Sequence, residues 1–147
     1  MTRQFPPLLL ARATVLLLNG RVHFPKEVLG EVIRGTEEDF AVFRKVTLDP
    51  ADAHPGSPGA IFEVRFQFAK YAEETNRRLS FIPIPLIIAQ PGFRSKTWAT
   101  GLQTGMFMGL YEWDTVEQAE AYWTSFPMDL MKRRAADGTL TREIRET

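Results

Sequence analysis

The chain has 147 residues, 44% of them hydrophobic, and its 18 basic residues balance 18 acidic ones. This length suits one domain, and the neutral charge balance gives no electrostatic reason to expect nucleic-acid binding. The sequence contains no cysteine, only two histidines (His23 and His54) and no phosphate-binding glycine motif, so disulfides, thiolate nucleophiles and cysteine-ligated metals are excluded, and we expect no metal and no cofactor.

The first patterned segment is an apolar run at residues 8–18, which Arg12 interrupts and Asn19-Gly20 closes. It is shorter than the roughly 20 apolar residues that span a bilayer, and it lacks the pattern of a signal peptide. We expect it to pack on the domain or on a partner subunit. Membrane contact through this segment is the less favoured alternative, and a cytoplasmic location is the default expectation.

Residues 40–48 are rich in β-branched and aromatic side chains and stop at Asp49-Pro50, which predicts a strand. The following loop at 52–59, which includes His54, is rich in proline and glycine. This loop separates an N-terminal extension, residues 1–59, from a main unit, residues 60–147.

The main unit begins with a strand, because residues 61–68 alternate strictly between apolar and polar side chains. Helix-forming residues follow at 69–79, and two prolines beyond them require that helix to end near Ser80. Residues 93–99 and 106–113 then read as two strands. The short connection between them holds two glycines, which favours an antiparallel hairpin.

A second helix is predicted after Asp114 or Thr115, either of which suits the N-cap position. Apolar residues recur at helical spacing from Val116 onward, and Pro127 starts a separate turn of helix. Residues 140–145 supply the last short strand.

The order from residue 60 onward is strand, helix, strand, strand, helix, strand. This is the order of a ferredoxin-like α+β fold, in which four antiparallel strands carry two helices on one face. The strand at 106–113 is apolar on both faces, as expected if a second copy of the sheet covers the other face. We therefore expect a homodimer that forms a dimeric α+β barrel.

Three stretches, PGFRSKTW (91–98), GLYEWD (109–114) and AEAY (119–122), resemble the YdhR-like monooxygenases. That family belongs to the dimeric α+β barrel superfamily, which also holds the antibiotic-biosynthesis monooxygenases. The resemblance covers about residues 60–145. It implies a small homodimer without metal or flavin that acts on, or holds, an apolar and often aromatic or polyketide-like molecule.

One face of the first hairpin strand combines cations with an indole, because alternation places Arg94, Lys96 and Trp98 together. Such a group suits binding of an enolate or phenolate, and we expect Trp98 to line a cavity. The alternative is that the two cations are solvated or paired with Glu63 and Glu112.

The leading hypothesis is a cofactor-independent, monooxygenase-like enzyme for an apolar enolisable, aromatic or polyketide-like small molecule. In such chemistry the deprotonated substrate supplies the electrons, so the protein provides a dry cavity, a base and groups that hold an oxyanion. A cofactor-free cyclase or isomerase would use the same cavity. A non-catalytic, dimeric ligand-binding module is the alternative from another class.

Residue chemistry then selects the candidate site. Cations suit an oxyanion, a tyrosine suits proton transfer, indoles form stacking walls and methionines line adaptable pockets. The predicted catalytic residues are Arg94, Lys96 and Tyr111. The predicted substrate-binding residues, the first of them a further oxyanion candidate, are Arg65, Trp98, Met106, Met108 and Trp113.

Overall fold

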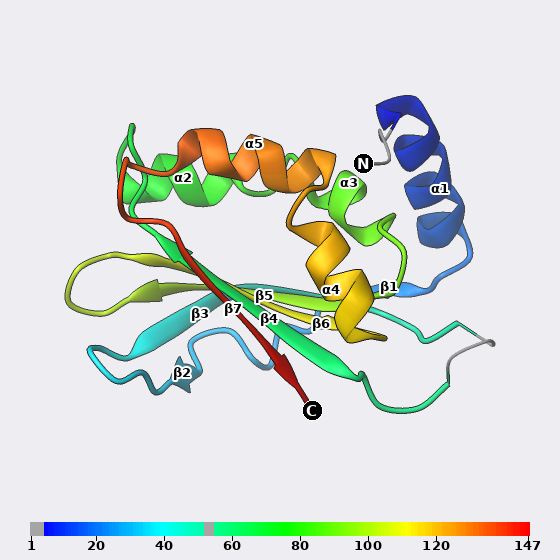
Figure 1. Cartoon of the computed structure of the whole chain (residues 1–147), viewed down its shortest axis with the longest axis horizontal. Coiled ribbons are helices and arrows are strands. Elements are labelled where there is room, and N and C mark those ends of the chain that lie inside the picture. Colours follow the sequence, from blue (N-terminus) through cyan, green and yellow to red (C-terminus); the bar gives the residue numbers. More distant parts are fainter. Residues whose placement is uncertain (1–4, 52–54) are drawn as a thin grey trace.

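The computed structural model describes residues 5–51 and 55–147, so His54 lies outside the described residues. Within these ranges seven strands form one antiparallel sheet, in the order β1-β3-β5-β6-β4-β7, and β2 pairs with β3. The helices lie together on one face of this sheet (Figure 1).

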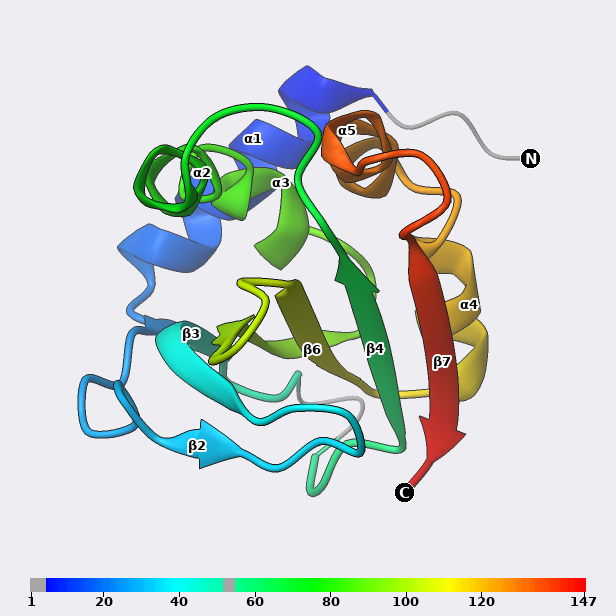
Figure 2. The same ribbon diagram turned by 90° about the vertical axis from the view of Figure 1, so that its left-hand side faces the viewer.

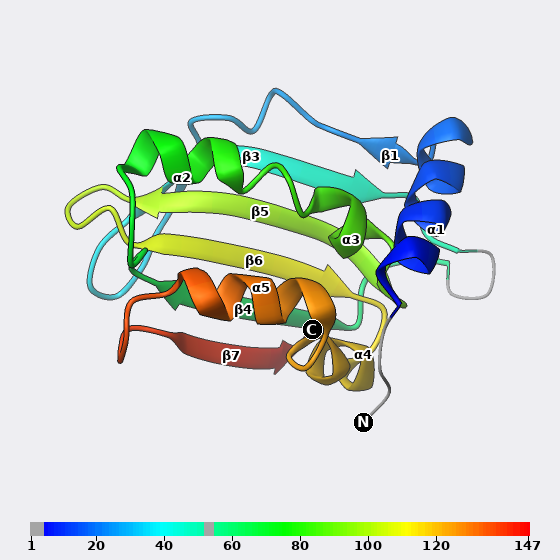
Figure 3. The ribbon, with the colours of Figure 1, turned by 90° about the horizontal axis from the view of Figure 1, so that it is seen from above.

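The main unit has the predicted ferredoxin-like topology. Its elements are β4 (Ala60–Phe66), α2 (Glu73–Leu79), α3 (Ile84–Ile88), β5 (Phe93–Gly101), β6 (Phe107–Trp113), α4 (Val116–Tyr122), α5 (Phe126–Arg134) and β7 (Thr141–Glu146). Their strands run in the order β7-β4-β6-β5, so each helical crossover joins two strands that flank a third, as Figure 3 shows from above. The predicted α+β class is confirmed.

The N-terminal residues extend the same sheet. Strand β3 (Phe40–Leu48) pairs with β5 along its length, and β1 (Val22–His23) and β2 (Val32–Ile33) pair with β3. Helix α1 (Pro6–Leu18) packs against α3 on the helical side of the sheet. None of the helices in the described parts of the chain is long and apolar enough to cross a membrane.

Local signals set the helix boundaries. The Thr115 hydroxyl accepts a hydrogen bond from the Gln118 amide, and the Ser125 hydroxyl accepts one from Met128, so both side chains act as N-caps. Helix α2 ends at Leu79, as the two prolines require. The sequence pattern does not predict α3, in which Pro85 sits in the first turn, where a missing N–H costs no helical hydrogen bond.

The main core lies between the sheet and its helices. The alternation of β4 buries Phe62, Val64 and Phe66 on that side. On the opposite face Phe40, Val42, Ala99 and Met108 form a second cluster, against which Val28, Ile33 and Met106 pack. The strand β2 and its flanking loops lie under this face (Figure 2), so the chain itself covers part of the surface that the sequence pattern assigned to a partner copy.

Candidate active site

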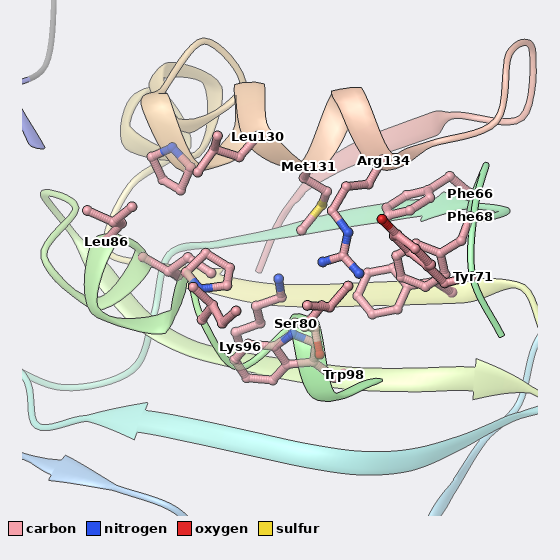
Figure 4. Close-up of a pocket in the computed structure, with 16 residues that line it drawn as sticks. Phe66, Phe68, Tyr71, Ser80, Leu86, Lys96, Trp98, Leu130, Met131 and Arg134 are labelled. Atoms are coloured by element: carbon pink, nitrogen blue, oxygen red, sulfur yellow. The ribbon is translucent and has the colours of Figure 1, made fainter. Parts of the chain in front are cut away.

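A cavity of about 380 Å³ lies between the sheet and helices α2, α3 and α5. Most of its wall is aromatic or aliphatic, with Phe66, Trp98, Phe107, Ile87 and Leu130 among the lining side chains (Figure 4). Tyr71 and Ile82 line the cavity and are each 71% exposed, so the cavity opens to solvent beside them. Its size and apolar wall suit a small organic molecule.

Lys96 is the principal polar group of this cavity. Its side chain is only 1% exposed, and its Nζ lies 4.6 Å from the ring centres of both Trp98 and Tyr111. Within residues 5–51 and 55–147 it makes no ion pair and no hydrogen bond. Burial, together with the charges of Arg44 and Arg134, holds the pKa of Lys96 well below its ordinary value.

The sheet fixes the position of Lys96. Strand β5 is flanked by β3 and β6, and Lys96 pairs with Val46 on one side and Tyr111 on the other. A Cβ atom at Gly109 would lie 3.4 Å from Lys96 Cε and 3.1 Å from Val64 Cγ1. The missing side chain at Gly109 therefore relieves crowding chiefly against Val64 and Tyr111, and the Lys96 methylene chain lies within van der Waals reach of the same position.

Arg134 and Arg44 add positive charge around the cavity. Arg134, at the end of α5, points its guanidinium toward the Lys96 amine (Figure 4) and donates to Asn76 Oδ1 at 3.0 Å. The Arg44 guanidinium, on β3, lies 5.4 Å from the Trp98 ring centre and donates to Ser80 Oγ at 2.7 Å. Burial lowers the pKa of both arginines.

The cavity is thus apolar and carries positive charge. Among the described residues no carboxylate lines it, whereas Lys96 and Arg134 both do. An apolar space with cations and no internal counterion suits an apolar molecule that carries, or can develop, a negatively charged oxygen. No group of three or more potential metal ligands occurs in the part of the chain that the structure describes.

Arg94 does not reach this cavity, so the expectation that it shares a face with Lys96 and Trp98 is wrong. The β5–β6 register shifts between Phe93 and Ser95, and this bulge turns Arg94 away from the alternation of the strand. Arg94 Nη1 instead donates to Asp114 Oδ1 at 2.9 Å, and its other amino group donates to the Gly56 carbonyl. Both side chains of the pair are nearly buried, which favours a structural role.

Three other predicted site residues lie on the opposite face of the sheet. Arg65 forms an ion pair with Glu63 at 2.6 Å and stacks over the Phe40 ring, and Met106 and Met108 pack in the second cluster. The reason is strand alternation. Both faces of β6 are apolar, so the sequence does not say which face meets the helices; in the structure the odd-numbered residues point toward the helices, and Met108 therefore points away. The structure does not bring Arg65 and the methionines together with Lys96.

Tyr111 and Trp113 lie on the helical side but within the core. The Tyr122 hydroxyl donates to the Tyr111 hydroxyl at 3.2 Å, and burial followed by the neighbouring Tyr122 raises the pKa of Tyr111 well above its ordinary value. The ring of Trp113 stacks on that of Tyr111, with 6.1 Å between the ring centres, and Trp113 lines a second pocket beside α4. Tyr111 thus forms the aromatic floor beneath Lys96, and its hydroxyl faces Tyr122 and Met131.

Sequence reasoning missed Arg134 and the side chains of α5 that line the cavity. Arg134 stands in the basic last turn of α5, where a cation already has a local explanation because it stabilises the carboxyl end of a helix. The signal was present, because Pro127, Leu130, Met131 and Arg134 follow helical spacing and so share one face. That this face lies above Lys96 depends on how α5 packs.

No protein-family model and no curated protein matches the chain. Among solved structures, an anthrone oxidase-like protein is similar, with a TM-score of 0.46 and 16% sequence identity. The match covers 74% of this chain but only 56% of that protein. The heme-degrading enzyme LmHde of Listeria monocytogenes gives a TM-score of 0.48 at 14% identity, with 89% of each chain covered.

A third similar structure is a ferredoxin-fold protein of Listeria monocytogenes 4b F2365, described as uncharacterized and as related to antibiotic biosynthesis monooxygenases. Its TM-score is 0.50 at 11% identity, with 85% of this chain and 90% of that chain covered. At this identity the likeness shows the ferredoxin-like fold alone. None of the three descriptions names the YdhR-like family, which stays a resemblance.

Proposed function

We propose that this protein is a cofactor-independent oxygenase for an apolar, enolisable or phenolic small molecule, with Lys96 as its base. The observation that carries this proposal is the buried Lys96 amine, which faces an apolar cavity and has no counterion among the described residues. The ferredoxin-like fold, shared with a protein related to antibiotic biosynthesis monooxygenases, is compatible with it.

The lowered pKa of Lys96 supports its role as a base. A buried amine whose pKa is lowered is neutral over a wider pH range, so its lone pair is free to take a proton from an activated C–H or O–H group. The ammonium that results then attracts the new anion, and this attraction is stronger in an apolar cavity than in water. Arg134 on α5 supplies a second cation on the opposite side of the cavity.

Molecular oxygen is the oxidant in the proposed reaction. Once an activated methylene group is deprotonated, its carbanion gives electrons to O₂. The methylene becomes a carbonyl, one oxygen atom enters that carbonyl and the other leaves as water, so atoms and electrons balance. The protein then needs only to bind, deprotonate and shield the molecule, which is the chemistry that Lys96 and the apolar wall offer. The proposed independence from cofactors rests on the sequence, which holds no cysteine and no nucleotide motif.

Oxygen uptake with anthrone, an apolar molecule with an acidic methylene group, tests this proposal. We expect uptake above the uncatalysed rate with the natural chain, and a loss of about a hundredfold or more in Lys96→Met, which keeps the bulk but removes the base. Lys132→Met is the matched control, because Lys132 also lies over an indole, at 4.1 Å from the Trp123 ring centre, but outside this cavity. Equal rates in the two variants would contradict the proposal.

A non-catalytic carrier for an apolar anion is the second candidate function. The observation that favours it is the presence of two cations, Lys96 and Arg134, in the same cavity, because such a cavity suits a ligand that is already ionised. Tight binding of 2-naphthoate together with no oxygen uptake from anthrone would support the carrier. A cyclase or isomerase would instead convert its substrate equally well without oxygen, so anaerobic product analysis separates it from both.

A further inference from the structure

The Lys96 amine is shielded from bulk solvent yet open to a molecule inside the cavity. The side chain is 1% exposed but lines the cavity, and Figure 4 shows its amine directed into the open space between the sheet and α5. Its methylene chain passes Gly109, and its Nζ sits above the rings of Trp98 and Tyr111. The amine is therefore held in one place, and its open side faces the cavity.

Burial and two neighbouring cations disfavour the charged form of Lys96. Arg44 on β3 and Arg134 on α5 are cations, and Tyr111 on β6 and Tyr122 on α4 are buried, neutral hydroxyls. No acidic group among the described residues lines the cavity to offset these charges. A desolvated lysine beside other cations keeps a free lone pair at a lower pH than an exposed lysine does, and this is the usual way in which proteins make lysine nucleophilic.

We propose that Lys96 is also a nucleophile that forms an imine with an apolar, preferably aromatic, aldehyde or ketone. The amine nitrogen bonds to the carbonyl carbon, and the carbonyl oxygen takes one proton from the amine and becomes the hydroxyl of a carbinolamine. That hydroxyl leaves as water with the second amine proton when the C=N bond forms, so the step consumes no oxidant or reductant. Arg134 faces the amine across the cavity and is the donor placed to bind the carbonyl oxygen as charge develops on it.

This inference goes beyond the oxygenase proposal. It depends on the apolar cavity and on the neutral amine, which the two proposals share, but it requires no O₂ and no acidic proton on the ligand. The wall of the cavity decides the ligand class, because aromatic and aliphatic side chains such as Trp98, Phe107 and Leu130 favour a flat, apolar carbonyl compound over a sugar or a keto acid.

Reductive trapping with 2-naphthaldehyde and cyanoborohydride, followed by peptide mapping, tests the proposal on the full chain. Near pH 7, about three units below the ordinary pKa of a lysine side chain, a fully solvated amine is almost wholly protonated and reacts slowly. The exposed Lys26 and Lys70 serve as internal references. We expect a naphthylmethyl group on Lys96 at a rate at least about tenfold above that of any other lysine. The α-amino group, whose ordinary pKa is near 8, is a separate background signal.

Three controls accompany the test, and two of them use the natural chain and so do not depend on how a variant folds. In the natural chain, 2-naphthoate has the same shape but no electrophilic carbonyl, so it should slow labelling of Lys96 without slowing labelling of Lys70. The ratio of Lys96 to Lys70 labelling should also rise as the pH is lowered from about 10 toward 7, because the lowered pKa of Lys96 keeps its amine neutral at a lower pH. The variant Lys45→Met should leave labelling of Lys96 unchanged.

Labelling that spreads evenly over the lysines of the folded chain, or that 2-naphthoate does not slow at Lys96, would overturn the imine proposal. Oxygen uptake and trapping report separately on the two proposals. Trapping at Lys96 without anthrone-dependent oxygen uptake would support the imine and reject the oxygenase. Oxygen uptake that is lost in Lys96→Met, without any trapping at Lys96, would support the oxygenase and reject the imine.

Discussion

At the scale of single residues, the proposed role of Lys96 comes at a cost to the stability of the fold. An ammonium group without an ion pair among the described residues is expensive to bury, and its contacts with the rings of Trp98 and Tyr111 offset only part of that cost. If the side chain at this position served only to fill space, an apolar side chain of the same length would give a more stable fold. This cost is consistent with the role that we propose for the Lys96 amine in the cavity.

The pH dependence of unfolding measures this cost. Because burial lowers the pKa of Lys96 in the folded state, the unfolded state binds more protons between that folded-state pKa and about 10.4, so Lys96 destabilises the fold increasingly as pH falls through this window. We expect Lys96→Met to be more stable than the natural chain at neutral pH. The gain should shrink as pH rises toward 10.4, by up to about 1.4 kcal/mol per pH unit.

Denaturant unfolding of both chains at several pH values, with Lys132→Met as the control, checks this expectation. A gain in Lys96→Met that stays constant over the window would mean that the Lys96 amine titrates as an ordinary lysine in the folded protein.

At the scale of elements, the bulge at the start of β5 separates two cations that regular alternation would place together. It sends Arg94 to Asp114 at the end of β6, and it leaves Lys96 on the helical face. The ion pair joins the beginning of β5 to the turn before α4, so it has a structural explanation. The Arg94 and Asp114 side chains are only 10% and 11% exposed, so the pair is shielded from solvent.

Substitution of Arg94 should therefore affect folding and not the chemistry of the cavity. We expect Arg94→Met to lower the free energy of unfolding by about 2 kcal/mol or more, because it removes one partner of a nearly buried ion pair. Trapping of 2-naphthaldehyde at Lys96, measured per folded molecule, should stay close to that of the natural chain. Loss of trapping with unchanged stability would support the original prediction that Arg94 belongs to the proposed site.

At the scale of the whole molecule, the chain itself covers only part of the outer face of the sheet. Val28 and Ile33 cover one part of it, but Ile61 and Leu110 lie elsewhere on that face and remain partly exposed. Helix α1 offers a second apolar surface, on which Leu8 and Leu18 are 66% and 81% exposed. Exposed apolar surfaces of this kind mark sites of association, and we retain the prediction of a homodimer through the outer face of the sheet.

Light scattering at micromolar concentration should give a mass of about twice 16.8 kDa. Leu110→Arg, on the outer face, should reduce the mass to that of one chain, whereas Leu18→Arg, on α1, should leave the dimer intact. A natural chain with a mass near 16.8 kDa would contradict the homodimer. The reverse pattern in the two variants would place the interface on α1.

The sequence by itself determined the features that depend on neighbours within a few residues. The alternation of β4, the N-cap at Thr115, the helix end near Ser80 and the separate helix at Pro127 all follow from local backbone preferences. Together they specify the order of elements and hence the ferredoxin-like fold, because few topologies accommodate that order. The shared face of Lys96 and Trp98 also follows from local alternation.

Only the tertiary structure decided which distant groups meet. The bulge that removes Arg94 from the site exists through the pairing register of β5 with β6, and the arrival of Arg134 above Lys96 depends on how α5 packs on the sheet. The burial that lowers the pKa of Lys96 comes from three helices and two flanking strands, all of them outside its own strand. The spacing of side chains along one segment does not predict such contacts, because the packing energy that fixes them is shared among residues of different segments.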